Sequence, residues 1–474
     1  MHVATHLAVA NPKKLNLDGM SLTPAAAAAL GSSLPEMTSL QVLEITGRGR
    51  HVLQVEEMEA LFGGFNNAMR PLCELTFSGF SVRGCLAPLI RSLRFFPNLT
   101  ALRLERLNMD ENDQCSLLKS FGPIRNLTEL RVCLRRWSDL DSFHYYSSKL
   151  NTFHRFTHGQ VVKRLTLDGI SLTPAVAAVL GLLLPEMSSL HTLEVTGVHQ
   201  SILEAEVMEV LFRRFNKTLP LHRLTLSSLS VRGCLSPLYR NLHFFPSLKE
   251  LNLENLDMGE HDSCLLKPLC CKAEITARVC SGKVTHKNLE ELRLDRISLT
   301  PSAAVALGQS LPEMSSLQVL RLTHMDGSIL RAEEMEALFG GFNKIMPLFL
   351  LTLNGFSVRG CLAPLFRSLR FFPNLTELNL EMLNMDEHDL NGLLESFQFI
   401  PKLQELILSR NPLGHSMRCI VPHVINLKKL RSLWIDQTNH SEEDLSYVRD
   451  TLQQALPELK ICGGTGLSSG CNQM

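Results

Sequence analysis

Apolar residues recur along the chain in the pattern L-x-x-L-x-L, typically 27, 28 or 31 residues apart. Alternate side chains of a strand point to the same face, so each copy predicts a short strand with one buried face. The copies start at Leu40, Leu72, Leu99, Leu127, Val162, Leu190, Leu221, Leu248, Leu289, Leu317, Leu348, Leu375, Leu403 and Leu430, with a weaker start at Pro12.

A helix is predicted after each strand. In SLTPAVAAVLGLLLPEM (171–187), Thr173 suits an N-cap, Pro174 suits the first helical position, and the helix should end before Pro185. Another segment has a buried helical stripe at i, i+3, i+4 and i+7, formed by Met58, Leu61, Phe62 and Phe65. One strand and one helix cannot bury their apolar faces alone, so neighbouring repeats must stack.

A longer repeat contains the short one. LNLDGMSLTPAAAAALGSSLPEM (15–37) returns in related form at 165–187 and 292–314. Ser441 with Asp444 predicts a capped last helix, and LKI (459–461) is a candidate closing strand. The predicted organisation is a lead (1–11), a repeat array (12–461) in three blocks (12–160, 161–288, 289–429) plus a C-terminal cap (430–461), and a flexible tail (462–474).

These repeats resemble leucine-rich repeats of the ribonuclease-inhibitor type. The expected fold is therefore an α/β leucine-rich repeat solenoid, a curved horseshoe with parallel strands on its concave face and helices on its convex face. Two stretches, 133–160 and 254–288, lose the rhythm and are expected to be an irregular loop or a degenerate repeat. Their role stays open.

The stretch LTLDGISLTPAVAAVLGLLLPEMSSLHTLEVTG (165–197) resembles the repeat region of NLR receptors, the nucleotide-binding, leucine-rich repeat immune sensors. The layout of residues 430–460 is similar to the NAIP/NLRC4 group. This resemblance implies ligand sensing or autoinhibition in innate immune signalling, with a protein or microbial ligand as partner. It also implies a nucleotide-binding module that this chain lacks, since no GxxxxGK[ST] loop occurs. The alternative is a stand-alone scaffold or inhibitor of the ribonuclease-inhibitor type.

One feature departs from the family pattern. Typical repeats place Asn or Cys three residues after the last strand leucine, and only Asn411 follows that rule here. The position is usually apolar in the other repeats, as at Met20, Phe80, Ile170, Leu229, Leu256, Ile297 and Phe356.

The binding surface is expected on the concave face, at the residue between the last two strand leucines. The column of such residues mixes both charges, which argues against nucleic acid because a continuous cationic track is missing. Trp434 is either an aromatic anchor or packs on the C-terminal cap. The candidate partner-binding residues are Glu44, Arg103, Arg131, Glu194, Arg293, Arg321 and Trp434.

Composition narrows the function further. Lys+Arg and Asp+Glu are 47 each, and no HExxH, GxSxG or dinucleotide fingerprint occurs, so we expect no enzyme activity and no cofactor. Thirteen scattered cysteines suit a reducing, cytoplasmic setting, and no signal peptide or membrane span is evident. A cluster of Cys264, Cys270, Cys271 and Cys280 near His261 and His286 lacks a CxxC pair, so no metal site is expected.

The motif SVRGC occurs at 81–85, 230–234 and 357–361. Its register predicts a strand-to-helix turn in which Gly84 takes a positive φ. Cys85 would then lie at a helix start, where the dipole favours a thiolate. The arginines Arg83, Arg232 and Arg359 are expected at exposed turns that face solvent.

Overall fold

The computed structural model describes residues 11–65, 69, 71–120, 124, 126–134, 161–197, 205–228, 236–254, 288–296 and 301–463. Within these ranges, the side chains of residues 20, 48–50, 205, 236, 239, 302, 325–328 and 415 are not described. The chain divides into two compact units: unit 1 is Met1–Leu229 with Phe244–Ser247, and unit 2 is Ser230–His243 with Leu248–Met474.

Unit 1 alternates strands with helices, and each strand pairs in parallel with the next one along the chain. Its strands are β1 (Lys14–Met20), β2 (Val42–Val52), β3 (Glu74–Ser81), β4 (Ala101–Leu107), β5 (Glu129–Leu134), β6 (Arg164–Ile170), β7 (Thr192–Gly197) and β8 (Arg223–Ser227). Its helices are α2 (Pro24–Ser33), α3 (Val55–Phe62), α4 (Ala87–Ser92), α5 (Glu111–Lys119), α6 (Pro174–Leu183) and α7 (Ala205–Phe212).

Unit 2 repeats this arrangement with the same parallel order. Its strands are β9 (Glu250–Glu254), β10 (Glu291–Asp295), β11 (Val319–Ile329), β12 (Leu350–Ser357), β13 (Glu377–Asn379), β14 (Glu405–Ile407), β15 (Ser432–Trp434) and β16 (Lys460–Cys462). Its helices are α8 (Ser236–Asn241), α9 (Pro301–Ser310), α10 (Ala332–Phe339), α11 (Ala363–Ser368), α12 (Glu387–Ser396), α13 (Val421–Val424) and α14 (Glu442–Ala455).

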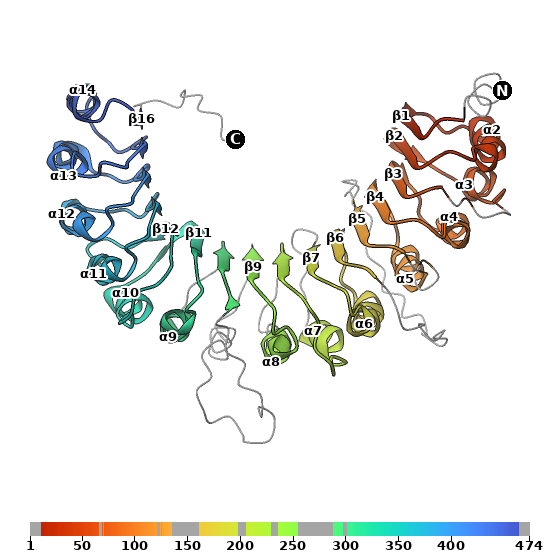
Figure 1. Ribbon diagram of the computed structural model, residues 1–474, viewed down its shortest axis with the longest axis horizontal. Coiled ribbons are helices and arrows are strands. Elements are labelled where there is room, and N and C mark those ends of the chain that lie inside the picture. Colours follow the sequence, from red (N-terminus) through yellow and green to blue (C-terminus); the bar gives the residue numbers. More distant parts are fainter. Residues whose placement is uncertain are drawn as a thin grey trace. The chain divides into compact units, whose positions relative to one another are not determined.

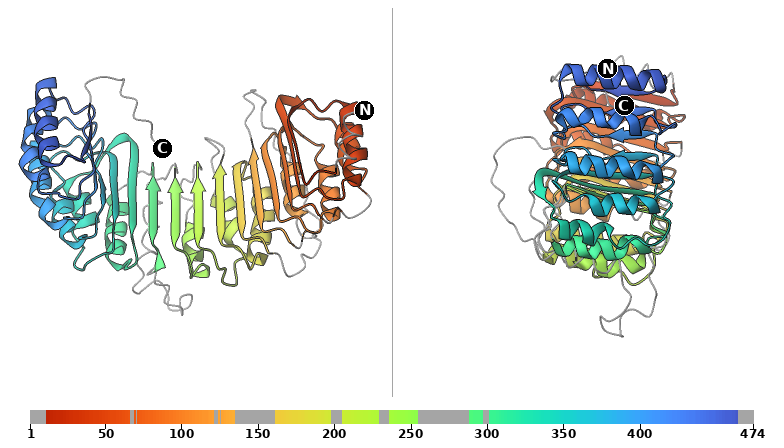
Figure 2. Two further views of the ribbon diagram at one scale, coloured as in Figure 1. Left: turned by 45° about the horizontal axis from the view of Figure 1, so that its top comes forward. Right: turned by 90° about the vertical axis from the view of Figure 1, so that its left-hand side faces the viewer.

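Within each unit the strands form one layer, and the helices cover one face of that layer (Figure 1). A second view shows the strands running side by side in each unit (Figure 2). The leucines of the repeat pattern fill the space between the layers, and Leu75, Leu102 and Leu351 are at most 1% exposed. Each predicted strand start is followed by a strand, which confirms the leucine-rich repeat solenoid. The division into three blocks remains a prediction.

Local sequence signals account for the helix ends. The hydroxyl of Thr173 accepts a hydrogen bond from the N–H of Val176, and α6 ends before Pro185 as predicted. Ser441 caps α14 by accepting from the N–H of Asp444. The predicted stripe through Phe65 is wrong in one respect: α3 ends at Phe62, so Phe65 is buried from the following turn rather than from the helix.

Glycine sets the distance between the first two helices of the recurring block. A Cβ added to Gly308 in α9 would lie 1.6 Å from the carbonyl oxygen of Ala337 in α10. The same clash would occur at Gly31 in α2, 1.8 Å from the carbonyl oxygen of Ala60 in α3. These helices pack backbone to backbone because the glycines have no side chain.

Several predicted features lie outside the described residues. They are most of the two irregular stretches (135–160 and 255–287), the cysteine cluster with its two histidines, the second SVRGC copy with Arg232, and residues 464–474 of the predicted tail. Cys462, assigned to that tail from sequence, belongs instead to β16, which pairs with β15.

Candidate binding surface on the strand face

The side chains between the buried leucines lie on the strand face of each unit, opposite the helices. Three parallel rows of such residues cross the strands, because neighbouring strands pair in register. In unit 1 the middle row contains Glu44, Arg103, Arg131 and Glu194, and Arg103 is directly opposite Arg131 on the next strand. In unit 2 it contains Arg293, Arg321 and Trp434.

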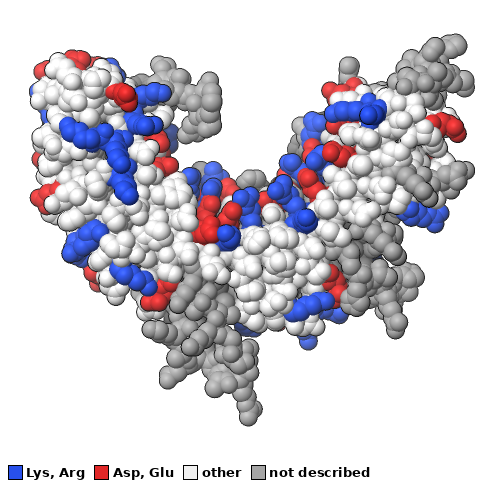
Figure 3. All heavy atoms as spheres, viewed as in Figure 1, with Lys and Arg blue, Asp and Glu red and all other residues white. Residues whose placement is uncertain are grey.

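The charges of the unit 1 face neutralise one another. Arg103 lies 3.3 Å from the Glu74 carboxylate and 3.4 Å from that of Glu129. Arg131 lies 3.5 Å from the carboxylate of Glu105 and donates to the sulfur of Cys133. The acidic and basic side chains are mixed on this face (Figure 3).

The two predicted acidic residues of unit 1 are also paired. Glu44 accepts from the ammonium of Lys14 at 3.1 Å. Glu194 accepts from the hydroxyl of Thr166 and lies 3.9 Å from Arg223. Exposed pairs of this kind contribute little to stability, but they leave few charges on this face open to a partner.

The strands of unit 2 carry more carboxylates than cations. Some carboxylates lie directly opposite one another, since Glu377 pairs in register with Glu405 and Glu250 with Glu291. Like charges in direct register destabilise a sheet. The described acidic side chains within its strands are Glu250, Glu254, Glu291, Asp295, Glu377 and Glu405, and the basic ones are Arg293, Arg321 and Lys460.

The surroundings of Glu377 and Asp295 disfavour the charge of each carboxyl group. Burial raises the pKa of the Glu377 carboxyl group, Glu405 raises it further, and Arg321 opposes both effects. Burial also raises the pKa of Asp295, which the hydroxyl of Thr323 partly offsets by hydrogen bonding at 3.1 Å. The unit 2 face thus holds carboxylates in positions that disfavour their charge.

The predicted cations of unit 2 do not remove this excess. Arg293 forms an ion pair with Glu291 on its own strand. Within the described part of the chain, the Nε atom of Arg321 is buried and has no hydrogen-bond acceptor.

Trp434 lies half-buried in the middle row, between Ile407 and Cys462. Its indole N–H donates to the carboxylate of Glu405 at 2.8 Å. The indole therefore joins the middle row to the neighbouring row, which contains Glu377 and Glu405. Sequence reasoning missed Glu377 and Glu405. Their signal is a Glu that recurs directly before the second leucine of the L-x-x-L-x-L pattern.

The SVRGC turn is completed by the following repeat. Gly84 adopts φ +71°, as predicted, and its N–H donates to the Asp113 carboxylate at 2.7 Å. The N–H of Leu86 donates to the same carboxylate at 3.4 Å. We call this arrangement the turn clamp. Asp389 forms a second one with the N–H groups of Gly360 and Leu362.

The thiolate predicted at Cys85 is wrong. The thiol is buried and donates to the carbonyl oxygen of Leu53, and burial together with the Asp113 charge raises its pKa to about 12. Arg83 and Arg359 are exposed, as expected, although Arg359 also lies 3.7 Å from the carboxylate of Asp386. The motif is thus a structural turn in the two described copies.

Asn411 fills the family's asparagine position as predicted and is fully buried. Its side-chain oxygen accepts from the N–H groups of Leu383 and Met385, and its amide donates to the carbonyl oxygens of Leu380 and Leu408. A single side chain therefore satisfies four backbone groups of two successive repeats.

Several solved structures are similar to this chain at low sequence identity. No family model matches the sequence. Similar solved structures include a leucine-rich repeat protein of Leptospira interrogans (15% identity, 96% of this chain and 97% of that chain, TM-score 0.47). Others are the plant peptide hormone receptor RGFR1 in complex with RGF2 (12%, 95% and 65%, 0.35) and TLR13 in complex with ssRNA13 (13%, 97% and 62%, 0.40).

Two further properties of the described residues concern metal ions and membranes. No three His, Cys, Asp or Glu side chains converge there to hold a metal ion. Across those same ranges, every helix is too short or too polar to span a bilayer.

Proposed function

We propose that this chain is the protein-binding leucine-rich repeat segment of an NLR-like cytosolic receptor. It would act in ligand sensing or autoinhibition in innate immune signalling, alongside a nucleotide-binding module outside this sequence. The sequence resemblance supports the receptor assignment, and the strand face of unit 2 supports protein binding. The candidate contact residues remain Arg293, Arg321 and Trp434 in unit 2, with Glu44, Arg103, Arg131 and Glu194 in unit 1.

One observation carries the binding proposal. Glu377 and Glu405 lie in register on adjacent strands, and the indole of Trp434 lies against the second of them. A sheet face without a partner gains nothing from opposed carboxylates. A basic protein segment would neutralise them and would find an aromatic side chain beside them, because cations favour the faces of aromatic rings.

Fluorescence polarisation with a labelled peptide of alternating Lys and Ala tests this proposal. Glu405→Lys should weaken its binding by about tenfold or more, because an attractive contact becomes repulsive. Glu395→Lys makes the same charge change at an exposed position of α12 and should leave binding unchanged. Equal weakening by both substitutions, or by neither, contradicts the proposal.

The receptor assignment has its own test. An in-frame GxxxxGK[ST] loop upstream in the transcript supports it. A native start at Met1 in a chain that is stable alone favours the stand-alone scaffold or inhibitor instead.

A further inference from the structure

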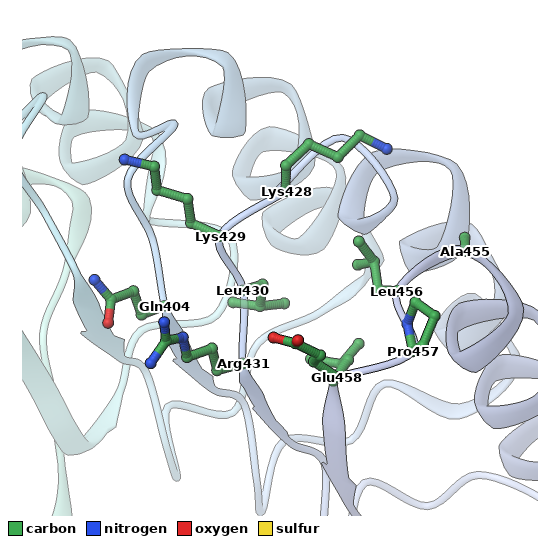
Figure 4. Close-up of a pocket in the computed structure, with 10 residues that line it drawn as sticks. Gln404, Lys428, Lys429, Leu430, Arg431, Ala455, Leu456, Pro457 and Glu458 are labelled. Atoms are coloured by element: carbon green, nitrogen blue, oxygen red, sulfur yellow. The ribbon is translucent and has the colours of Figure 1, made fainter.

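A hollow of about 600 Å³ lies at the C-terminal end of unit 2, on the edge of the sheet where β15 and β16 begin (Figure 4). The loop from α13 to β15 and the loop from α14 to β16 form most of it. A second hollow of about 420 Å³ shares Arg431 and Glu458 with the first and adds Ser432 and Lys460. This site borders the strand-face carboxylates, because Ser432 pairs in register with Glu405. It is built from other residues, and it does not depend on the function proposed for Glu377 and Glu405.

The lining of the hollow combines an apolar floor with a cationic rim. Leu430, Leu456 and Leu459 are buried side chains among its lining residues. Lys428 and Lys429 are exposed on one side of Leu430, and Arg431 lies on the other beside Gln404 (Figure 4). A ligand that fits this lining must offer both an apolar group and negative charges.

The cations of the rim lack partners within the described residues. Lys428, Lys429, Arg431 and Lys460 make no side-chain hydrogen bond or ion pair there, although Glu458 belongs to the same lining. The preceding repeat differs, since Lys402, at the position equivalent to Lys429, donates to the side-chain oxygen of Asn374 at 2.7 Å. The positive charge of the hollow is therefore available to a ligand.

The backbone fixes the spacing of these groups. The N–H of Arg431 donates to the carbonyl oxygen of Gln404, and the N–H of Lys460 donates to that of Arg431, both at 2.8 Å. Because these bonds extend the sheet ladder, the side chains that line the two hollows start from a rigid edge. A rigid site loses less conformational entropy on binding than a flexible loop does.

We propose that this hollow binds an acidic peptide segment of a partner protein, with one apolar side chain on the leucine floor and carboxylates at Lys428, Lys429 and Arg431. Arginine binds carboxylates bidentately, and lysine adds a point charge. A nucleic acid fits less well, because no aromatic side chain in the lining can stack on a base.

Fluorescence polarisation of the whole chain with a labelled peptide, Ser-Asp-Glu-Leu-Asp-Glu-Phe-Gly, tests the proposal. Lys429→Glu combined with Arg431→Glu should weaken binding by about tenfold or more. Replacing the acids of the peptide by Asn and Gln, or its Leu and Phe by Gln, should also weaken binding to the unaltered chain. A peptide with Lys in place of its acids should bind the double variant better than it binds the unaltered chain.

Lys344→Glu is the matched control, because it reverses an exposed charge of unit 2 elsewhere and should not change binding. Thermal unfolding of both variants followed by circular dichroism shows whether they remain folded. The peptide of alternating Lys and Ala is assigned to Glu377 and Glu405, so its response to Glu405→Lys separates failure of the proposed function from failure of this proposal. Unchanged acidic-peptide binding by a folded double variant overturns the proposal, as does tighter, variant-sensitive binding of an oligothymidine.

Discussion

Asn411 shows how one side chain can join two repeats. Its amide group bonds to backbone atoms on both sides of the boundary, and the side chain is fully buried. Sequence alone identified this residue, since it stands at the family position. The apolar residues at the equivalent position of other repeats also showed, from sequence alone, that this chain departs from typical leucine-rich repeats.

Asn411→Ala should lower the free energy of unfolding by about 3 kcal/mol or more, because buried N–H and C=O groups lose their partners. Urea unfolding followed by circular dichroism measures this change. Asn374→Ala is the control, since that side chain lies at the surface and its loss should cost less than about 0.5 kcal/mol. A similar cost for both substitutions would mean that Asn411 is not a structural link.

Asp113 gives the turn clamp a dependence on pH. Burial raises the pKa of its carboxyl group to about 6, and the N–H of Gly84 opposes the shift. The unfolded chain has the ordinary value of 3.8. The stability linked to this group is thus fully present below about pH 4 and is lost as the pH rises through 6.

The unaltered chain should therefore lose about 1–3 kcal/mol of unfolding free energy relative to Asp113→Asn between pH 4 and pH 7. Urea unfolding of both proteins across this range gives the difference. At any one pH, the difference in unfolding free energy between the two proteins also includes the hydrogen bonds that the substitution removes. The change of this difference with pH is therefore the informative quantity. A difference that stays constant with pH would show that Asp113 has an ordinary pKa.

At the scale of the element, most of the described repeats share one unusual backbone conformation. The residue two places after the last strand leucine has a positive φ, and the described cases are Gly19, Gly79, Arg106, Gly169, Ser228, Arg296, Gly355, Met382, Arg410 and Gln437. Dipeptides such as Asp-Gly and Asn-Gly signal this turn in four repeats. The others carry side chains that conceal it, so the sequence predicted the strands but not the full series of turns.

Gly308 permits a prediction about helix packing. Helix propensity alone favours Ala by about 1 kcal/mol, but the added Cβ would clash with the backbone of α10. Gly308→Ala should therefore lower the unfolding free energy by about 1–3 kcal/mol. Val305→Ala, at an exposed position of the same helix, should change it by less than about 0.5 kcal/mol. A stabilised Gly308→Ala variant would show that the helices separate freely.

At the scale of the whole molecule, equal numbers of acidic and basic residues conceal an uneven distribution. The middle row alone contains Arg293 and Arg321, whereas the carboxylates lie in the rows on either side of it. The row of carboxylates can be recognised only from the strand register, which places Glu377 beside Glu405. Charge pairing across strands depends on register, which repeat spacing predicts only for the leucines themselves.

The hollow beside Leu430 was even harder to predict from the sequence than the row of carboxylates. Its lining comes from two loops that the leucine pattern treats as spacers, and their lysines look like ordinary surface residues in one dimension. Fold and strand positions followed from periodicity, because periodicity reports burial. Sites between loops depend on side chains that have no periodic constraint.

The turn clamp also has a consequence for synthesis on the ribosome. Gly84 leaves the exit tunnel before Asp113 does, so the N–H groups at this turn have no carboxylate partner until the following helix has emerged. The N–H of Gly360 likewise has no carboxylate partner until Asp389 has emerged. A nascent chain that stalls between these residues therefore exposes an incomplete turn, and a chaperone or protease that reads unsatisfied backbone would meet it at the growing end.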